Sequence, residues 1–370
     1  MTQKVLILGG QGRIGSQVIA DIWAHTSAAI TQTGRRPRQP RPESPRCRFL
    51  ALDLGDRPAV TAAIEGHDLV IHCAGPFKYR DRHVLETCID RGIHYLDVAD
   101  NPNYVKNALA LSPQAQAAGI TAIVSTGVFP GLSNSLVRQG IEQLDAAQTI
   151  QLDYGVAGSG GAGRTVMRTT FLELQHPFAA WMDGQWQTVK PYSQRERVSF
   201  PPPYGRCGVY WFNTVEAMTL AESFPVETVV TKFGSWPDFY NHLTWLMAHG
   251  LPKPWLQKST VVEFLAQVSY RLTQVTDPIS GVGIAMMARI QGLKNQQSVE
   301  YRATLTHPDT AIAAGIGTGS IAQAILSGAL SKPGVWPVEQ GVPTALFEST
   351  LAERGLTIQS EITPSQNPGF

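Results

Sequence analysis

The sequence predicts an α/β protein, with a doubly wound parallel sheet and an inserted second α+β domain that contains a mixed or antiparallel sheet. Two observations lead to this prediction. Over the first 145 residues, short β-branched and apolar runs alternate with amphipathic stretches, which is typical of βαβ units. From Ile150 onward, that alternation gives way to segments rich in Thr, Val, Tyr and Phe with turn signals between them.

The expected strands of the first domain are short and mostly apolar, because strands of a parallel sheet are buried on both faces. The runs 5–8 and 69–71 contain only apolar residues. The six expected strands are Lys4–Leu8, Ala28–Thr33, Phe49–Asp53, Leu69–Cys73, His94–Val98 and Thr121–Ser125. Between and after them, helices are expected to begin near Arg13, Pro58, His83 and Tyr104, and after Pro130.

The second domain carries turn signals at Asp183-Gly184 and Pro201–Pro203, and a strand-like alternation over Ser298–Thr306. After Thr310 the pattern becomes helical and uncharged up to Ser331. That stretch is long enough to span a membrane, but its four glycines and polar side chains predict a closely packed internal helix. We therefore expect a first domain over 1–145, an inserted domain over 146–308, and a helical return of 309–370 onto the first domain.

Composition excludes several classes of protein. Thirty Lys and Arg against 29 Asp and Glu give a net charge of +1, without the basic excess of a nucleic-acid-binding domain. The apolar content of 43% and charged content of 16% indicate a globular chain. The four cysteines lack metal-binding spacing and predict reduced thiols in a cytoplasmic protein. No HExxH, GxSxG or P-loop motif is present, so neither a metal site nor hydrolase or kinase chemistry is indicated.

A glycine pattern, Gly10-Gln-Gly12-Arg-Ile-Gly15, lies between the first expected strand and the first expected helix. In a dinucleotide site, the first glycine permits a tight turn, the second lets the backbone approach a diphosphate, and the third lets helix and strand pack closely. The helix N-terminus then presents its N–H groups to the phosphates. A purely structural glycine turn is the alternative. Because further βαβ units follow, we predict a Rossmann-type dinucleotide site.

The end of the second expected strand indicates which dinucleotide binds. An NAD site would place a carboxylate there for the ribose 2′-hydroxyl. This sequence has Thr33-Gly34-Arg35-Arg36 instead. Guanidinium groups match a 2′-phosphate in charge and geometry, which predicts NADP(H). The alternative is that Arg35 and Arg36 simply belong to a solvated loop rich in Arg and Pro.

Several motifs in order resemble those of the saccharopine dehydrogenase-like (saccharopine reductase) oxidoreductases. They are the segments Val5–Gly15, Asp68–Phe77, Cys88–Asp100, Gly127–Asn134, Gly158–Thr165 and Gly334–Glu339. The resemblance implies a Rossmann domain, an inserted substrate or dimerisation domain, and a C-terminal return. The nucleotide contacts that it implies are Gly10, Gly12, Arg13, Ile14, Gly15, the Arg35 region, Asp53 near the adenine, and Ala74, Gly75 and Pro76.

Candidate catalytic residues follow the later strands, because ligands of a doubly wound sheet bind outside the carboxyl ends of the strands. Tyr79, Asp97 and Asp100 are the candidate proton donors or acceptors there. Each has a structural alternative: Tyr79 as a rim residue, Asp97 as an acceptor for loop amides, and Asp100 as part of a turn before Asn101-Pro102.

Two features of the second domain have open interpretations. Arg164 and Arg168, four residues apart, are candidate ligands for an anionic substrate group, or are surface arginines beside a glycine-rich turn. The aromatic set consists of Trp236, Phe239, Tyr240, Trp245 and Trp255. It is typical of a core or dimer interface, with an apolar substrate site or peripheral membrane contact as alternatives.

Together these features predict an NADP(H)-dependent oxidoreductase that acts on a small molecule, with no nucleic-acid partner and no transmembrane span. We expect a cytoplasmic homodimer in which 1–145 binds NADP(H) and 146–308 binds substrate or dimerises. The resemblance implies hydride transfer to or from a C=N or activated C=C bond. The alternatives are a lipid-type enoyl reductase and a non-catalytic NADP(H)-binding sensor or assembly protein. Charged residues lining the cleft of the second domain would favour imine reduction, whereas a neutral cleft with aromatic walls would favour a lipid-type enoyl reductase.

Overall fold

The computed structural model describes residues 2–37, 45–160, 164–256 and 258–365. The chain divides into two compact units. Unit 1 comprises Met1–Ser135 and Ala311–Leu356, and unit 2 comprises Leu136–Thr310 and Thr357–Phe370. Each unit is built around its own sheet.

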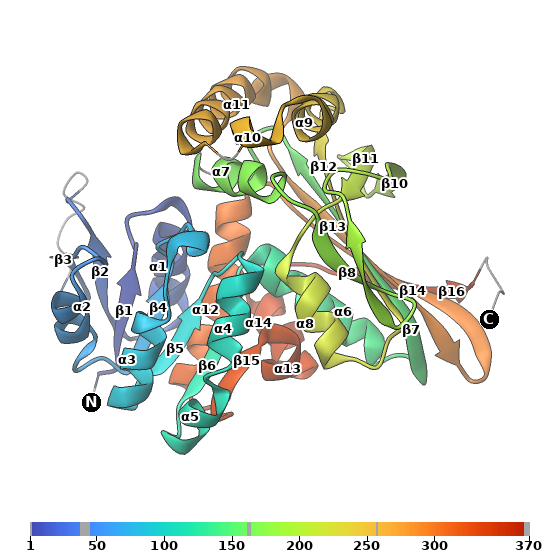
Figure 1. Ribbon diagram of the computed structural model, residues 1–370. Helices are drawn as coiled ribbons and strands as arrows, with labels where there is room; N and C mark the ends of the chain where they lie inside the picture. Colours follow the sequence, from blue (N-terminus) through green and yellow to red (C-terminus); the bar gives the residue numbers. More distant parts are fainter. Residues whose placement is uncertain (1, 38–44, 161–163, 257, 366–370) are drawn as a thin grey trace. The chain divides into compact units, whose positions relative to one another are not determined.

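Unit 1 contains a seven-stranded sheet of order β15-β6-β5-β4-β1-β2-β3, in which every neighbouring pair is parallel (Figure 1). Its strands are β1 Lys4–Leu8, β2 Ala29–Gly34, β3 Cys47–Ala51, β4 Leu69–His72, β5 His94–Asp97, β6 Thr121–Val124 and β15 Gly334–Pro337. The six predicted strands and the doubly wound α/β class are confirmed. The order of strand addition reverses between β1 and β4, which is where such sheets bind ligands.

The predicted helices of unit 1 are also present, with two turns of irregular helix. The helices are α1 Arg13–His25, α2 Arg57–Ile64, α3 His83–Arg91, α4 Pro102–Leu109, α5 Ser112–Ala117, α12 Thr310–Leu326, α13 Val338–Gly341 and α14 Thr344–Glu353. The short turns are η1 Phe77–Tyr79 and η2 Val128–Leu132. Side-chain caps fix two of these starts, because Asp56 accepts from the Ala59 amide at 3.1 Å and Asn101 accepts from the Tyr104 amide at 3.1 Å.

The glycines of α12 explain why this uncharged helix is packed inside the protein. A Cβ on Gly315 would lie 2.7 Å from the backbone carbon of Gln17, and one on Gly317 would lie 2.7 Å from the Gly127 carbonyl oxygen. The backbone of α12 therefore lies directly against α1 and against the loop after β6. The expectation of a closely packed internal helix is confirmed, and among the described residues no helix is long and apolar enough to cross a membrane.

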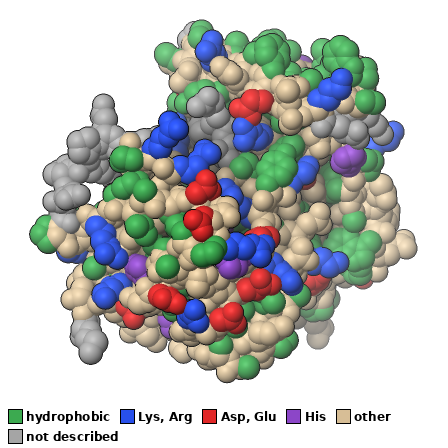
Figure 2. Space-filling view, turned by 60° about the vertical axis from the view of Figure 1, so that its left-hand side comes forward, with side chains coloured by type: hydrophobic (Ala, Val, Ile, Leu, Met, Phe, Trp, Pro, Cys, Tyr) green, Lys and Arg blue, Asp and Glu red, His purple; other side chains and the backbone are tan. Residues whose placement is uncertain are grey.

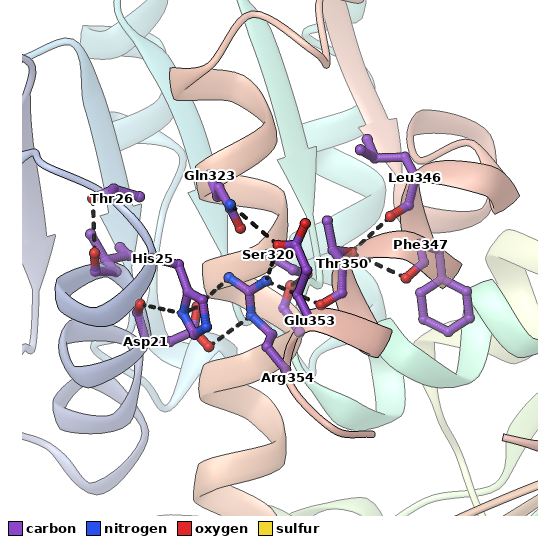
Figure 3. A network of polar contacts seen from close by, with 12 residues as sticks. Asp21, His25, Thr26, Ser320, Gln323, Leu346, Phe347, Thr350, Glu353 and Arg354 are labelled. Atoms are coloured by element: carbon purple, nitrogen blue, oxygen red, sulfur yellow. Dashed lines mark hydrogen bonds and ion pairs between the residues drawn. The ribbon is translucent and has the colours of Figure 1, made fainter. Parts of the chain in front are cut away.

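A buried ion pair fastens the C-terminal return to α1 (Figure 3). Arg354, which follows α14, donates from Nε and Nη2 to the two carboxylate oxygens of Asp21 at 2.9 and 2.7 Å. The two side chains are only 1% and 6% exposed. Residues 333 positions apart in the sequence thus connect α1 with the segment after α14.

The C-terminal segment contains two strands where the sequence predicts only helix. β15 pairs in parallel with β6 and completes the sheet of unit 1. β16, Gln359–Pro364, pairs antiparallel with β14 at the edge of the other sheet. β15 has only four residues, of which the first is a glycine and the last a proline. Every residue of β16 is exposed. Neither strand therefore shows the alternation of buried apolar and exposed residues from which a strand is predicted.

Unit 2 contains a mixed sheet of order β10-β11-β12-β7-β13-β14-β16, together with a separate hairpin of β8 and β9. Only β12 and β7 pair in parallel. The strands are β7 Ala146–Ala157, β8 Phe178–Met182, β9 Gln185–Val189, β10 Glu196–Phe200, β11 Gly205–Trp211, β12 Thr228–Trp236, β13 Gly283–Lys294 and β14 Gln297–His307. The predicted mixed sheet of the second α+β domain is confirmed.

The helices of unit 2 are short except for α11. They are α7 Arg164–Glu173, α8 Val215–Ser223, α9 Phe239–Gly250, α10 Lys253–Leu256 and α11 Ser259–Ser280, while α6 Ser133–Ile141 begins in unit 1 and leads into unit 2. Figure 2 shows hydrophobic side chains along the top of the view, where α9 and α11 lie. Phe239, Trp245, Trp255 and Phe264 are each about half exposed or more, at 56%, 47%, 55% and 65%.

Candidate dinucleotide site

The glycine turn between β1 and α1 has no room for side chains. A Cβ on Gly15 would lie 2.3 Å from the Gly9 carbonyl oxygen, and one on Gly10 would lie 2.8 Å from the Cβ of Gln32. Gly9 has a φ of +76°, and its position would bring a Cβ within 2.9 Å of the Cβ of Ala74. These contacts are the close helix–strand and strand–strand approaches that the sequence predicts for a dinucleotide turn.

The start of α1 is arranged to accept an anion. Gly12 is its N-cap, no side chain caps the helix there, and its first turn contains no acidic residue. The Gly12 amide is used within the turn, where it donates to the Gly9 carbonyl at 2.8 Å. Helix amides that lack an intrahelical acceptor carry partial positive charge, so this end of α1 can hold a diphosphate. Arg13 and Ile14 are the first two residues of α1; Arg13 is exposed and Ile14 is half-buried.

The end of β2 lies beside the glycine turn. Gly9 donates from its amide to Thr33 Oγ1 at 3.2 Å, and a Cβ on Gly34 would lie 2.9 Å from Gln11 Oε1. Arg35 and Arg36 follow directly and are exposed. Asp53, just beyond β3, is also exposed and accepts the Gly55 amide at 2.9 Å. The predicted contacts for the adenosine half of the nucleotide thus follow two neighbouring strands.

The loop after β4 provides the predicted Ala74-Gly75-Pro76 segment, in which all three residues are half-buried. His72, at the end of β4, accepts the Ala74 amide at Nδ1 at 3.2 Å, and its ring lies 4.9 Å from that of Phe77. Burial lowers the pKa of His72 to about 3, so the ring is neutral at physiological pH. The sequence prediction did not include Arg80, which donates from Nε to the Ala74 carbonyl at 2.8 Å.

Asp97 lies at the end of β5 and is fully buried. Its Oδ1 accepts the amides of Ala99 and Ser125 at 3.0 and 2.7 Å, and its Oδ2 accepts the Tyr95 hydroxyl at 3.0 Å. Ser125 has a φ of +63° and donates from Oγ to the Ala99 carbonyl at 2.8 Å. Asp97 therefore ties together the loops after β5 and β6, at the edge of the sheet where ligands of this fold bind.

The other two catalytic candidates are more accessible. Tyr79 ends the turn η1 and is 61% exposed. Asp100 is half-buried, and its charge helps to raise the pKa of the neighbouring Asp97. The structure thus places Asp97 and Asp100 close together on one loop and Tyr79 on the loop after β4.

We expect the Asp97→Asn variant to remove part of the pH dependence of stability. Burial, and to a smaller degree the Asp100 charge, raises the pKa of Asp97 to about 6. A carboxyl group whose pKa is raised in the folded state stabilises the fold at low pH, and that contribution is lost as the pH rises from about 4 to above 6. The loss amounts to about 3 kcal/mol. Urea unfolding between pH 4.5 and 7.5 should show the wild type losing more stability than the variant, and parallel profiles would contradict this prediction.

Of the two predicted anion ligands in unit 2, the structure describes the side chain of only one. Arg164 begins α7, and its side chain lies outside the part of the structure that is described. Arg168 forms an ion pair with Glu263 of α11. Its role as an anion ligand stays a prediction, and a substrate carboxylate would have to compete with Glu263 for it.

The aromatic set of the second domain divides between core and surface. Trp236 packs on Phe200 with ring centroids 5.2 Å apart, and Tyr240 is 9% exposed. Phe239, Trp245 and Trp255 point outward. Among the residues that the structure describes, no group of three or more His, Cys, Asp or Glu side chains could hold a metal ion.

These features define the class of protein. The parallel sheet, the glycine turn without room for a Cβ and the uncapped helix start together form a site for a dinucleotide, and arginines at the end of β2 fit NADP(H). Residues 5–123 match the family model of the saccharopine dehydrogenase NADP-binding domain. The chain thus carries a saccharopine dehydrogenase-type NADP-binding domain over residues 5–123.

Curated relatives match the chain well beyond that domain. Carboxynorspermidine synthase of Vibrio cholerae is 25% identical over 78% of this chain and 76% of its own length. Carboxyaminopropylagmatine dehydrogenase of Synechocystis sp. is 23% identical over 95% of this chain and 96% of its own length. Among solved structures, apo saccharopine dehydrogenase (L-Glu forming) from Saccharomyces cerevisiae has a TM-score of 0.69 and covers 98% of this chain and 100% of its own, at 13% identity. That likeness shows a shared fold.

Proposed function

We propose that the protein uses NADPH to reduce a carbon–nitrogen double bond formed between an amine and a carbonyl compound, and that the product is a carboxylated polyamine-like secondary amine. The observation that carries this proposal is the match to carboxyaminopropylagmatine dehydrogenase, which extends through unit 2 as well as unit 1. A match confined to the nucleotide domain would say nothing of the substrate. The names of both curated relatives denote carboxylated polyamines.

Charged side chains within the sheet of unit 2 support imine reduction over the alternative of a lipid-type enoyl reductase. Arg289 of β13 donates to Asp153 Oδ2 and to Glu196 Oε1, each at 2.8 Å. Lys232 donates to Glu196 Oε2 at 2.9 Å, and Gln151 donates to both carboxylates. The hydrogen bonds from Lys232 and Arg289 lower the pKa of Glu196 to about 2 against the opposing effect of burial, so it is ionised at physiological pH. A lipid site would instead be neutral and aromatic, whereas Phe239, Trp245 and Trp255 of the predicted aromatic set are exposed.

Reduction of an imine needs a hydride at carbon and a proton at nitrogen, and bound NADPH supplies the hydride. For the proton we propose Tyr79 and Asp100, because both are accessible at the edge of the sheet where ligands bind. Asp97 is fully buried with both oxygens engaged, so we propose that it positions the loops after β5 and β6.

The proposed function predicts oxidation of NADPH when an amine and a carbonyl compound are supplied together. The panel should pair diamines and agmatine with aldehydes that carry an amino-acid group, and NADPH absorbance would report turnover. Each component alone is the control. Turnover with α,β-unsaturated thioesters instead would favour the lipid enoyl reductase, and tight NADPH binding without turnover of either class would favour a sensor or assembly protein.

We also propose that the protein is a cytoplasmic homodimer. The four cysteines are thiols and not paired in disulfides, which suits a reducing compartment. The exposed aromatic residues of α9 and α10 suit a dimer interface, since such interfaces are enriched in Trp and Phe. Light scattering of the purified chain at several concentrations, with and without a Trp245→Ser substitution, would test the oligomer.

A further inference from the structure

Arg80 is a half-buried arginine whose terminal nitrogens donate no hydrogen bond to another described residue, although the Asp53 and Asp81 carboxylates act on its charge. Its Nε donates to the Ala74 carbonyl at 2.8 Å, which holds the base of the guanidinium against the loop after β4. The neighbouring carboxylate, Asp81, forms its ion pair with Arg57 instead. The two Nη groups of Arg80 are therefore fixed in place with hydrogen-bond capacity left over.

A second arginine follows the neighbouring strand end. Arg80 holds the Ala74 carbonyl, Ala74 lies against Gly9, and Gly9 donates from its amide to Thr33, two residues before Arg35. Arg35, at the end of β2, is exposed and has no ion-pair partner among the residues that the structure describes. The charge of Arg35, together with the larger effect of burial, lowers the pKa of Arg80, and the Asp53 carboxylate acts in the opposite direction. The Asp53 and Asp81 carboxylates offset part of the repulsion between the two arginines, and an anion bound between the guanidinium groups would offset more of it.

The topology brings these groups to the adenosine end of the dinucleotide site. β2 and β4 are the two neighbours of β1, and the glycine turn follows β1. Gln11 of that turn lies against Gly34 at the end of β2, directly before Arg35. An anion that contacts both arginines would thus lie next to the ribose of a dinucleotide whose diphosphate rests on α1.

We propose that Arg80 joins Arg35 in binding the 2′-phosphate of NADP(H), so that the cofactor preference depends on the loop after β4 as well as on the end of β2. The inference rests on the dinucleotide site described above. Arg36 stays a predicted ligand of the same phosphate, and Arg80 adds to the predicted set. A guanidinium whose Nε is already held needs little further ordering to donate from its terminal nitrogens to a phosphate.

The test compares Arg80→Ala with Arg82→Ala, a nearby arginine that is paired with Glu86 on the surface. Dissociation constants for NADPH, NADH and 2′,5′-ADP would be measured by calorimetry, together with the thermal midpoint of each variant. Arg80→Ala should weaken NADPH and 2′,5′-ADP about tenfold or more and leave NADH within twofold, because only the first two carry the phosphate. Arg82→Ala should change none of the three.

Arg80→Lys keeps the positive charge and serves as the second variant if Arg80→Ala folds poorly. It should bind 2′,5′-ADP more tightly than Arg80→Ala and less tightly than the wild type. Equal weakening of NADPH and NADH would overturn the proposal, since it would place Arg80 against the adenine or in a structural role. An unchanged preference for NADPH in Arg80→Ala would also overturn it and leave the proposed function intact. Wild-type protein that binds neither dinucleotide would overturn the proposed function and this inference together.

Discussion

Gly15→Ala is expected to reduce NADPH affinity by about 100-fold or more and to destabilise unit 1. The added Cβ would lie 2.3 Å from the Gly9 carbonyl oxygen and 2.9 Å from the Cα of Gly10. Both contacts are with backbone, so relief requires α1 to move away from the turn. Such a movement withdraws the helix amides from the diphosphate, and the loss of two charge-assisted hydrogen bonds corresponds to about two orders of magnitude in affinity.

A matched glycine in unit 2 provides the control for Gly15→Ala. A Cβ on Gly250 would meet only the end of the flexible Leu246 side chain, at 2.9 Å. Gly250→Ala should therefore bind NADPH like the wild type and unfold at a similar denaturant concentration. Calorimetric titration with NADPH and urea unfolding of both variants measure the two effects. Near-normal NADPH binding by Gly15→Ala would mean that the diphosphate does not lie on the start of α1.

The strands of the nucleotide-binding sheet could be predicted because each carries its own local signal. β1 after Lys4 and β4 before His72 are buried runs of apolar residues, and the glycine turn directly follows β1. Such signals depend on neighbours in the sequence, so they are visible before the fold is known. β3 shows the limit of this reasoning, since it begins at Cys47, two residues before the predicted start, in a partly exposed segment.

The remaining features depend on contacts between distant segments. β15 is recognisable as a strand only through its pairing with β6, more than 200 residues earlier. Arg80 lies in a polar stretch of sequence. Its nearness to the Arg35 segment becomes visible only when β2 and β4 are seen on either side of β1. The hydrogen bonds of Asp97 come from amides on two different loops. From the sequence alone, an acceptor for loop amides and a catalytic acid or base were both open for this residue.

The ion pair between Asp21 and Arg354 is another such contact, and its position gives it a large expected effect. Asp21 lies in the second half of α1, and a Cβ on Gly319 of α12 would lie 2.1 Å from its Oδ1, so the carboxylate fills the space between the two helices. Arg354 also donates from Nη1 to the Thr350 carbonyl at 3.1 Å. Removing Arg354 would leave the buried Asp21 carboxylate with only the partly exposed His25 ring, 3.6 Å from Oδ1, beside it.

Arg354→Met is accordingly expected to lower the free energy of unfolding of unit 1 by about 3–5 kcal/mol. The transition that includes unit 1 should be identified as the one that NADPH shifts to higher urea concentration. Arg91→Met is the control, since it breaks the exposed pair between Arg91 and Glu65 and should cost no more than about 1 kcal/mol. Combining Asp21→Asn with Arg354→Met should recover part of the loss, because no unpaired charge remains. If Arg354→Met and Arg91→Met proved equally mild, the buried pair would not be what holds the C-terminal return against α1.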